Sequence, residues 1–188
     1  MSVVGFVVAG GESRRMGRDK ALLPWGGADF LGHAIARLRG ITDDVRILCG
    51  PGTRYLDRGL PVHPDLAPGA GPLGGVLTGL TAAPDRLGLF LAVDLPYVPV
   101  ALLARLVERS LGWDAVVPVS SRGPEPLCGV YGPGCREPIR RRMDAGDFKM
   151  TGFWPDVRVM EVGPAELRGF GDPGDMFRNL NTPNDLTK

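Results

Sequence analysis

A glycine- and arginine-rich segment near the beginning of the 188-residue chain carries the strongest chemical signal. Residues 9–20 read Ala-Gly-Gly-Glu-Ser-Arg-Arg-Met-Gly-Arg-Asp-Lys and directly follow an apolar run. Glycines let the backbone approach an anionic ligand closely, and successive backbone N–H groups can cradle it. Positive charge comes from four nearby side chains, Arg14, Arg15, Arg18 and Lys20. The segment therefore indicates a polyphosphate site; a basic surface loop with glycine turns is the alternative.

The spacing of this segment differs from that of two common nucleotide motifs. Arg18 and Asp19 separate Gly17 from Lys20, so this segment is not the phosphate loop G-x-x-x-x-G-K-[ST], and it is not G-x-G-x-x-G either. The sequence shows no serine, histidine and acid arrangement and no histidines at metal-ligand spacing. These absences favour metal-assisted transfer over hydrolysis through a covalent intermediate.

Two aspartates follow apolar runs that are typical of strands. Asp94 ends the most apolar run of the chain, Leu87–Val93, and Asp65 follows Pro61–His63. Ligands collect at the carboxyl ends of strands in open parallel sheets. A carboxylate there can bind Mg²⁺ together with substrate phosphates, and Asp65 could accept hydrogen bonds from a base edge such as guanine N1–H and N2–H₂. The alternatives are an aspartate that caps a turn before Pro96 and a loop that leads into a helix.

The elements that must position these residues alternate along the chain. Helical spacing of apolar residues predicts helices around residues 31–38, 73–80 and 102–107. Apolar runs predict strands at Val3–Val8, Val45–Leu48, Pro61–His63, Leu87–Val93 and Ala115–Val119. This order implies an α/β fold whose parallel sheet is covered by helices on both faces. In the less regular last third we expect strands at 126–131 and 157–162 and a helix at 136–143, all within a single domain, residues 1–188.

Composition excludes several classes of protein. A net charge of +1 argues against a broad nucleic-acid or membrane surface. None of the cysteines, Cys49, Cys128 and Cys135, is at C-x-x-C spacing, which predicts reduced thiols. The run Val3–Val8 has no basic leader before it and is too short to span a bilayer. We therefore expect a cytoplasmic protein.

The end of the chain is rich in asparagine and reads Asn179-Leu180-Asn181-Thr182-Pro183-Asn184-Asp185. Asn181 or Thr182 could cap a final helix that has Pro183 at its first position. The asparagine side chains could also bind a heterocycle or an ordered loop.

Taken together, these segments resemble the molybdenum cofactor guanylyltransferase family. The resemblance covers nearly the whole chain and is carried by the following motifs: Ala9-Gly10-Gly11-x-Ser13-x-Arg15-Met16-Gly17-x-Asp19-Lys20, Asp65…Gly71-Pro72-Leu73-x-Gly75, Asp94-x-Pro96, Glu125-Pro126-Leu127-Cys128…Tyr131 and Asn179-x-Asn181-Thr182-Pro183-x-Asp185-Leu186. It implies a Rossmann-like three-layer α/β/α nucleotidyltransferase fold with a mostly parallel central sheet, and GTP bound at the strand ends.

The resemblance also implies a reaction and the residues that perform it. GMP would pass from GTP to the terminal phosphate of molybdopterin, with or without molybdenum, to form molybdopterin guanine dinucleotide and pyrophosphate. The implied nucleotide-binding residues are Ala9, Gly10, Gly11, Lys20, Asp65 and Asp94. The implied catalytic residues are Lys20, Arg15 and Asp94, of which Asp94 binds Mg²⁺. Asn179 and Asn181 would bind the acceptor.

The implied partners are GTP and molybdopterin, with other molybdenum cofactor biosynthesis or acceptor proteins as further candidates, and no nucleic acid or membrane. The N-terminal part of the domain would bind the nucleotide and the C-terminal part the acceptor. Two alternatives stay open: a CTP- or other NTP-dependent nucleotidyltransferase of the same fold, and a non-catalytic GTP-binding adaptor.

Overall fold

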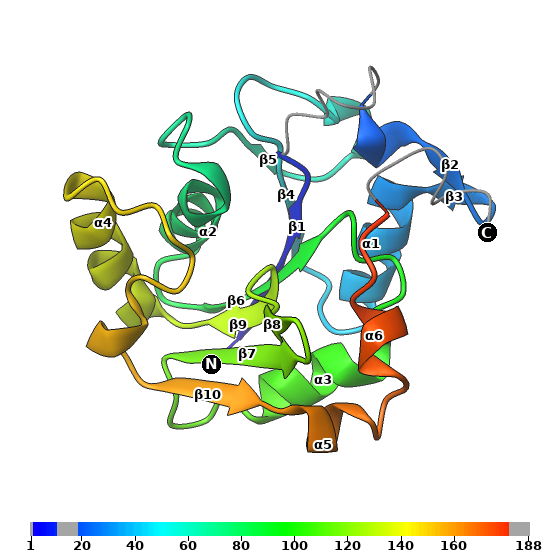
Figure 1. The fold of residues 1–188 in the computed structure, drawn as a ribbon. Coiled ribbons are helices and arrows are strands. Elements are labelled where there is room, and N and C mark those ends of the chain that lie inside the picture. Colours follow the sequence, from blue (N-terminus) through cyan, green and yellow to red (C-terminus); the bar gives the residue numbers. More distant parts are fainter. Residues whose placement is uncertain (1, 11–18, 181–188) are drawn as a thin grey trace.

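A single twisted sheet organises the protein (Figure 1). The computed structural model describes residues 2–10 and 19–180. The strands of the main sheet are β1 (Val3–Val8), β4 (Val45–Leu48), β5 (Val62–His63), β6 (Leu87–Ala92), β7 (Ala115–Ser120), β8 (Gly123–Pro124), β9 (Cys128–Tyr131) and β10 (Val159–Val162). Their order is β10-β7-β9-β6-β1-β4-β5, with β8 paired to β7.

Most strand pairs in this sheet are parallel. β1 lies between β4 and β6, with Val7 opposite both Ile47 and Leu91, and pairs with both in parallel. The β4–β5 and β7–β10 pairs are also parallel. Strand β9 runs the other way and inserts between β6 and β7. The predicted mostly parallel sheet is therefore confirmed, with one antiparallel strand in its middle.

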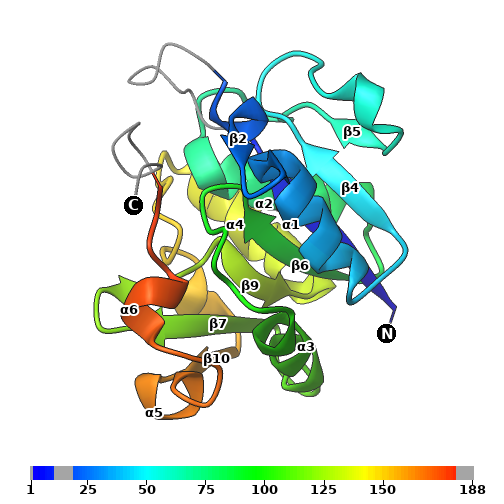
Figure 2. The same cartoon turned by 90° about the vertical axis from the view of Figure 1, so that its right-hand side faces the viewer.

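The helices form a layer on each face of the sheet (Figure 1), and Figure 2 looks onto one of these layers. Helices α1 (Phe30–Arg39) and α3 (Val100–Glu108) cover one face, together with the short helices α5 (Pro164–Leu167) and α6 (Pro173–Met176). Helices α2 (Gly71–Ala82) and α4 (Arg136–Asp144) cover the other face. Each layer buries its own apolar cluster against the strands, which confirms the three-layer α/β/α arrangement.

The glycine-rich sequence of α2 has a packing reason. A Cβ atom at Gly79 would lie 2.7 Å from a ring carbon of Phe90, a residue of the central strand β6. Only glycine lets the helix approach the sheet this closely. The Phe90 ring stacks on Phe6 at a centroid distance of 5.0 Å, so these two rings fill the space beside Gly79.

Short elements fill the connections. A hairpin of β2 (Pro24–Trp25) and β3 (Ala28–Asp29) precedes α1, and single-turn 3₁₀ segments are η1 (Lys20–Leu22), η2 (Leu56–Arg58), η3 (Pro133–Cys135) and η4 (Trp154–Asp156). The hairpin, β8, α5 and α6 are absent from the sequence-based prediction, which also starts the last two strands two residues early. The predicted final helix capped by Asn181 or Thr182 lies outside the described residues.

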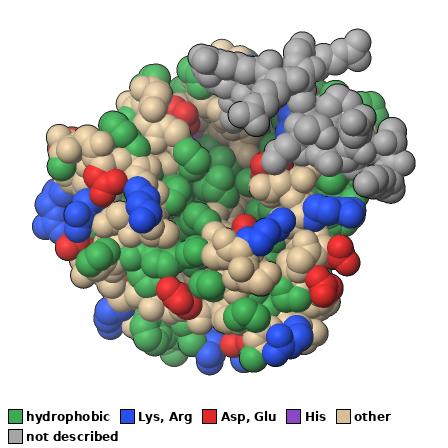
Figure 3. All heavy atoms as spheres, viewed as in Figure 1, with side chains coloured by type: hydrophobic (Ala, Val, Ile, Leu, Met, Phe, Trp, Pro, Cys, Tyr) green, Lys and Arg blue, Asp and Glu red, His purple; other side chains and the backbone are tan. Residues whose placement is uncertain are grey.

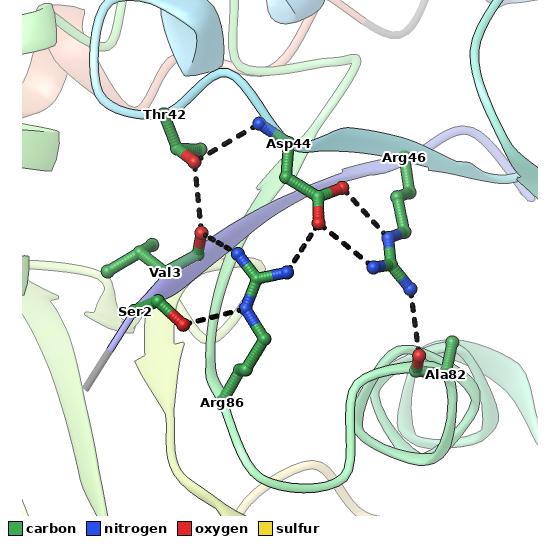
Figure 4. A network of polar contacts seen from close by, with 7 residues as sticks. All are labelled: Ser2, Val3, Thr42, Asp44, Arg46, Ala82 and Arg86. Atoms are coloured by element: carbon green, nitrogen blue, oxygen red, sulfur yellow. Dashed lines mark hydrogen bonds and ion pairs between the residues drawn. The ribbon is translucent and has the colours of Figure 1, made fainter.

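A polar network ties the amino-terminal edge of the sheet together (Figure 4). The Asp44 carboxylate accepts hydrogen bonds from Arg46, at 2.9 Å to each oxygen, and from Arg86. Arg86 also donates to the Val3 carbonyl at 2.8 Å, and Arg46 donates to the Ala82 carbonyl at 2.8 Å. The Asp44 carboxylate and its two arginines therefore connect the starts of β1, β4 and β6 to the end of α2.

The three cysteines are buried free thiols, as predicted. Within the described ranges, no helix is long and apolar enough to cross a membrane.

Candidate functional site

A cavity of about 620 Å³ opens at the carboxyl ends of β1, β4 and β6. A volume of this size is typical of small-molecule sites, which span roughly 300–1,000 Å³. Figure 3 shows a hollow on this face, floored mostly by hydrophobic side chains. The cavity wall is formed by Val8, Ala9, Gly10, Asp19, Lys20, Ala21, Leu48, Pro51, Asp65, Gly69, Gly71, Pro72, Gly75, Ala92, Val93, Asp94 and Leu127. The site therefore lies where ligands collect in open parallel sheets.

Five of the predicted site residues meet in this cavity. The cavity is lined by Ala9, Gly10, Lys20, Asp65 and Asp94, which come from widely separated parts of the sequence. A second hollow, of about 480 Å³, lies near Leu87, Trp113 and Arg158 at the opposite edge of the sheet, and its lining includes none of the predicted residues. The predicted site residues therefore gather at the carboxyl edge of the sheet and not at the opposite edge.

Lys20 and Asp94 face each other across the cavity. The Lys20 Nζ atom lies 3.6 Å from Asp94 Oδ2, and the two side chains are 12% and 32% exposed. Lys20 begins η1, whose N-cap is Asp19. Asp94 is the second residue after β6, and Val93 N donates to the Val8 carbonyl at 3.1 Å, which ties the end of β6 to the end of β1. A cation and an anion are therefore both held at the rim by backbone structure.

Asp65 lies on the wall between the end of β5 and the start of α2. Its backbone N–H donates to the Gly50 carbonyl at 3.0 Å, which fixes the loop. Burial raises the pKa of the Asp65 carboxyl, and the positive charge of Arg54 opposes that shift in part. Because a half-buried carboxylate is costly without hydrogen-bond donors, this position suits a ligand that brings donors.

The C-terminal segment crosses the same rim. Leu180 N donates to the Asp94 carbonyl at 3.4 Å. Arg122 donates to the Phe177 carbonyl, and the Arg178 guanidinium lies 4.8 Å from the centre of the Tyr97 ring. Asn179 is exposed and stands next to this contact, although it does not line the cavity. Gly11, Arg15 and Asn181 lie outside the described residues.

Two residues at the rim have no assigned role in the sequence analysis. Leu127 lines the cavity, and its carbonyl accepts from Ala92 N at 2.9 Å. The Glu125 carboxylate accepts from Ser120 Oγ at 2.9 Å. Burial raises the pKa of Glu125, and the negative charge of Asp94 adds to that shift. Both residues belong to the motif Glu125-Pro126-Leu127-Cys128, but only the structure brings that motif beside Asp94.

Asp94 fits magnesium as one ligand of a shared set. In the part of the chain that the structure describes, no group of three or more histidine, cysteine, aspartate or glutamate residues could hold a metal ion. Mg²⁺ commonly takes one or two protein carboxylates and completes its shell with substrate phosphates and water. A single half-exposed carboxylate at the edge of a ligand-sized cavity is compatible with that mode of binding.

The sequence matches a described family over most of its length. The family model for the MobA-like NTP transferase domain matches residues 5–154. A protein of Pelotomaculum thermopropionicum named probable molybdenum cofactor guanylyltransferase is 37% identical, and the match covers 100% of this chain and 92% of that protein. A molybdenum cofactor guanylyltransferase of Desulfosudis oleivorans is 30% identical, with 100% and 94% covered.

Solved structures share the fold. Molybdopterin-guanine dinucleotide biosynthesis protein A from Archaeoglobus fulgidus superposes with a TM-score of 0.79 at 24% identity, covering 100% of this chain and 95% of that one. The 2-C-methyl-D-erythritol 4-phosphate cytidylyltransferase from Thermus thermophilus gives a TM-score of 0.68 at 20% identity, covering 97% and 94%. The resemblance seen in the motifs is confirmed: this chain is a nucleotidyltransferase that belongs to the MobA-like NTP transferase family.

Proposed function

We propose that this protein transfers GMP from GTP to the terminal phosphate of molybdopterin and releases pyrophosphate. The observation that carries the proposal is the Lys20–Asp94 pair, which faces a ligand-sized cavity at the carboxyl edge of the sheet. The relatives that cover nearly the full chain and bear the name molybdenum cofactor guanylyltransferase support the choice of base and acceptor.

The reaction needs no protein nucleophile. A phosphate oxygen of the acceptor attacks the α-phosphorus of GTP, a P–O bond forms, and the bond to the β-phosphate oxygen breaks. The difficulty lies in bringing anions together and in the charge that grows on the leaving pyrophosphate, so positioning and electrostatic stabilisation are the main requirements.

The assigned roles follow from these requirements. Lys20 and the backbone of Ala9, Gly10 and Gly11 hold the phosphates, and Arg15 adds positive charge. Asp94 would hold Mg²⁺, and the bound ion would offset negative charge on the phosphate oxygens. Lys20 lies beside Asp94 and keeps positive charge where the pyrophosphate departs.

Asp65 is the proposed reader of the base. Guanine presents N1–H and N2–H₂, two donors that a carboxylate can accept together, whereas adenine and cytosine lack that pair of adjacent donors. The Asp65 carboxyl is half-buried in the cavity wall, and burial raises its pKa. A guanine edge would supply donors to it.

The acceptor is assigned to the C-terminal part of the same domain, residues 1–188. Asn179 and Asn181 belong to the segment that Leu180 attaches to the Asp94 carbonyl, so an acceptor bound there would reach the metal side of the cavity. The cytoplasmic location, and an association with other molybdenum cofactor biosynthesis or acceptor proteins, stay predictions.

Calorimetric titration with GTP, CTP and ATP in the presence of Mg²⁺ tests both the preferred base and the position of the binding site. We expect GTP to bind most tightly, and Lys20→Ala to weaken its binding by roughly tenfold or more, as for the loss of a charge-assisted contact. A preference for CTP would assign the chain to a cytidylyl-transferring branch of the same fold. Equal GTP affinity in Lys20→Ala would remove Lys20 from the site.

A further inference from the structure

One side chain from outside the glycine-rich loop contacts both ends of that loop. The Tyr55 hydroxyl lies 2.7 Å from Asp19 Oδ2 and 3.4 Å from the Ala9 carbonyl oxygen. Ala9 follows β1, and Asp19 precedes η1. The tyrosine therefore links the residue that follows β1 to the residue that precedes Lys20.

Tyr55 is held in an unusual backbone conformation. Its φ of 67° and ψ of 24° place it in the left-handed region, and it is the only non-glycine residue with positive φ in the described ranges. The side chain is also buried, at 6% exposure. Such a conformation costs free energy in a bulky residue and persists where surrounding contacts fix it. Backbone strain of this kind is frequent beside functional sites.

Arg54 reinforces the same contact. Its Nη1 atom lies 3.0 Å from Asp19 Oδ2, and its Nη2 donates to the Cys49 carbonyl at 2.6 Å. The guanidinium also lies 5.2 Å from the centre of the Tyr55 ring. Burial and the Asp19 charge raise the pKa of Tyr55, so its hydroxyl stays protonated and donates. Arg54 and Tyr55 thus share one oxygen of Asp19.

The other oxygen of Asp19 organises the residues around Lys20. Asp19 Oδ1 accepts the Ala21 N–H at 3.1 Å and caps η1, the turn that begins at Lys20. The lysine side chain extends from this turn to within 3.6 Å of Asp94. The contacts of Arg54 and Tyr55 therefore act on Lys20 through a single carboxylate.

We propose that Arg54 and Tyr55 are positioning residues that fix the Asp19 carboxylate and, through it, hold Lys20 toward the triphosphate of the nucleotide. The proposal rests on the proposed function, because it assigns the phosphates to Lys20. Neither residue is assigned a contact with the ligand. Tyr55 acts on Lys20 through Asp19, so its effect should fall on the phosphates and not on the base. The charge of Arg54 also acts on Asp65, so the test uses Tyr55.

The variant Tyr55→Phe tests this directly, because it removes the hydroxyl and keeps the ring over Arg54. We expect the affinities for GTP, CTP and inorganic pyrophosphate, measured by calorimetry with Mg²⁺, to fall by roughly tenfold, the scale of a lost hydrogen bond to a charged group. Guanosine carries no phosphate, so its affinity should not change. The matched control is Tyr131→Phe, which removes a buried hydroxyl that donates to the Pro126 carbonyl at 2.7 Å.

A double-mutant cycle shows whether the effect runs through Asp19. Asp19→Asn keeps an oxygen for the Ala21 cap and removes the negative charge that Arg54 contacts. If Tyr55 acts through Asp19, the double variant should bind pyrophosphate no more weakly than Asp19→Asn alone, since contacting residues are not additive. A further tenfold loss of pyrophosphate affinity in the double variant would show that Tyr55 acts independently of Asp19.

The outcomes separate this proposal from the proposed function. If wild type binds GTP and Tyr55→Phe binds it equally well, or guanosine binding falls in parallel, the positioning role is overturned and the transferase assignment stands. If wild type prefers CTP and Tyr55→Phe weakens CTP and pyrophosphate alike, the positioning role stands and the guanylyl assignment falls. Failure of wild type to bind any triphosphate or pyrophosphate would overturn both.

Discussion

The two edges of the central sheet use aspartate in opposite ways. At the amino-terminal edge, Asp44 receives hydrogen bonds from two arginines (Figure 4), and these hold its pKa at about 2. At the carboxyl edge, burial raises the pKa of Asp65. A hydrogen bond from Arg46 is the main cause of the first pKa shift, and burial is the main cause of the second. A carboxylate that the fold satisfies stabilises the fold, whereas one left short of donors is available to a ligand.

The largest difference between the edges should appear in catalysis. Asp94→Ala should lower kcat by roughly 10²–10³, on the scale of losing one preorganised electrostatic group. Its midpoint of urea unfolding should stay close to that of wild type, because the side chain is part of an exposed rim. Turnover near the wild-type value would show that Asp94 is not the magnesium ligand.

Asp65 sharpens the contrast through selectivity. Asp65→Asn should reduce the preference for GTP over ATP by roughly tenfold, since a carboxylate is replaced by an amide that offers a donor where guanine needs an acceptor. The raised folded-state pKa means that the charged form destabilises the folded protein once the pH exceeds the unfolded value. The same variant should therefore be slightly more stable than wild type at pH 7. Unchanged selectivity in nucleotide competition assays would exclude Asp65 as the base reader.

Asp44 should give the smallest effect, and it should be on stability alone. Asp44→Asn should lower the free energy of unfolding at pH 7 by about 1 kcal/mol, the scale of net hydrogen bonds at a partly exposed position. The depressed pKa of about 2 implies a contribution that is present above the ordinary value of 3.8 and is lost as the pH falls through about 2. The difference from wild type in urea unfolding should shrink between pH 4 and pH 2, whereas kcat per folded molecule should not change. A loss of turnover in Asp44→Asn would contradict a purely structural role for this aspartate at the amino-terminal edge.

The sequence predicted the long elements and the rim residues for a clear reason. Runs such as Leu87–Val93 are long and apolar enough to identify a buried strand, and the residue after such a strand lies at the carboxyl edge. Asp65 and Asp94 were found by this rule, and Lys20 by the glycine- and arginine-rich segment after the first strand. Only the structure shows that all three share one cavity.

The remaining features depend on contacts between distant segments. The insertion of β9 between β6 and β7 is set by pairing such as Phe90 with Gly129, which no local pattern encodes. The two-residue strands β2, β3 and β8 are too short to show a period. Arg54 and Tyr55 belong to no motif, and the left-handed conformation of Tyr55 becomes meaningful only when its hydroxyl is seen to reach Ala9 and Asp19.

The most direct test of the account is the reaction itself. Purified protein is incubated with molybdopterin, Mg²⁺ and GTP, CTP or ATP in turn, and pyrophosphate release is measured together with the dinucleotide product. The account predicts pyrophosphate release that requires Mg²⁺ and molybdopterin, is fastest with GTP, and yields one molybdopterin guanine dinucleotide per pyrophosphate. Binding of GTP without any pyrophosphate release under these conditions would contradict the transferase assignment and favour a non-catalytic GTP-binding adaptor.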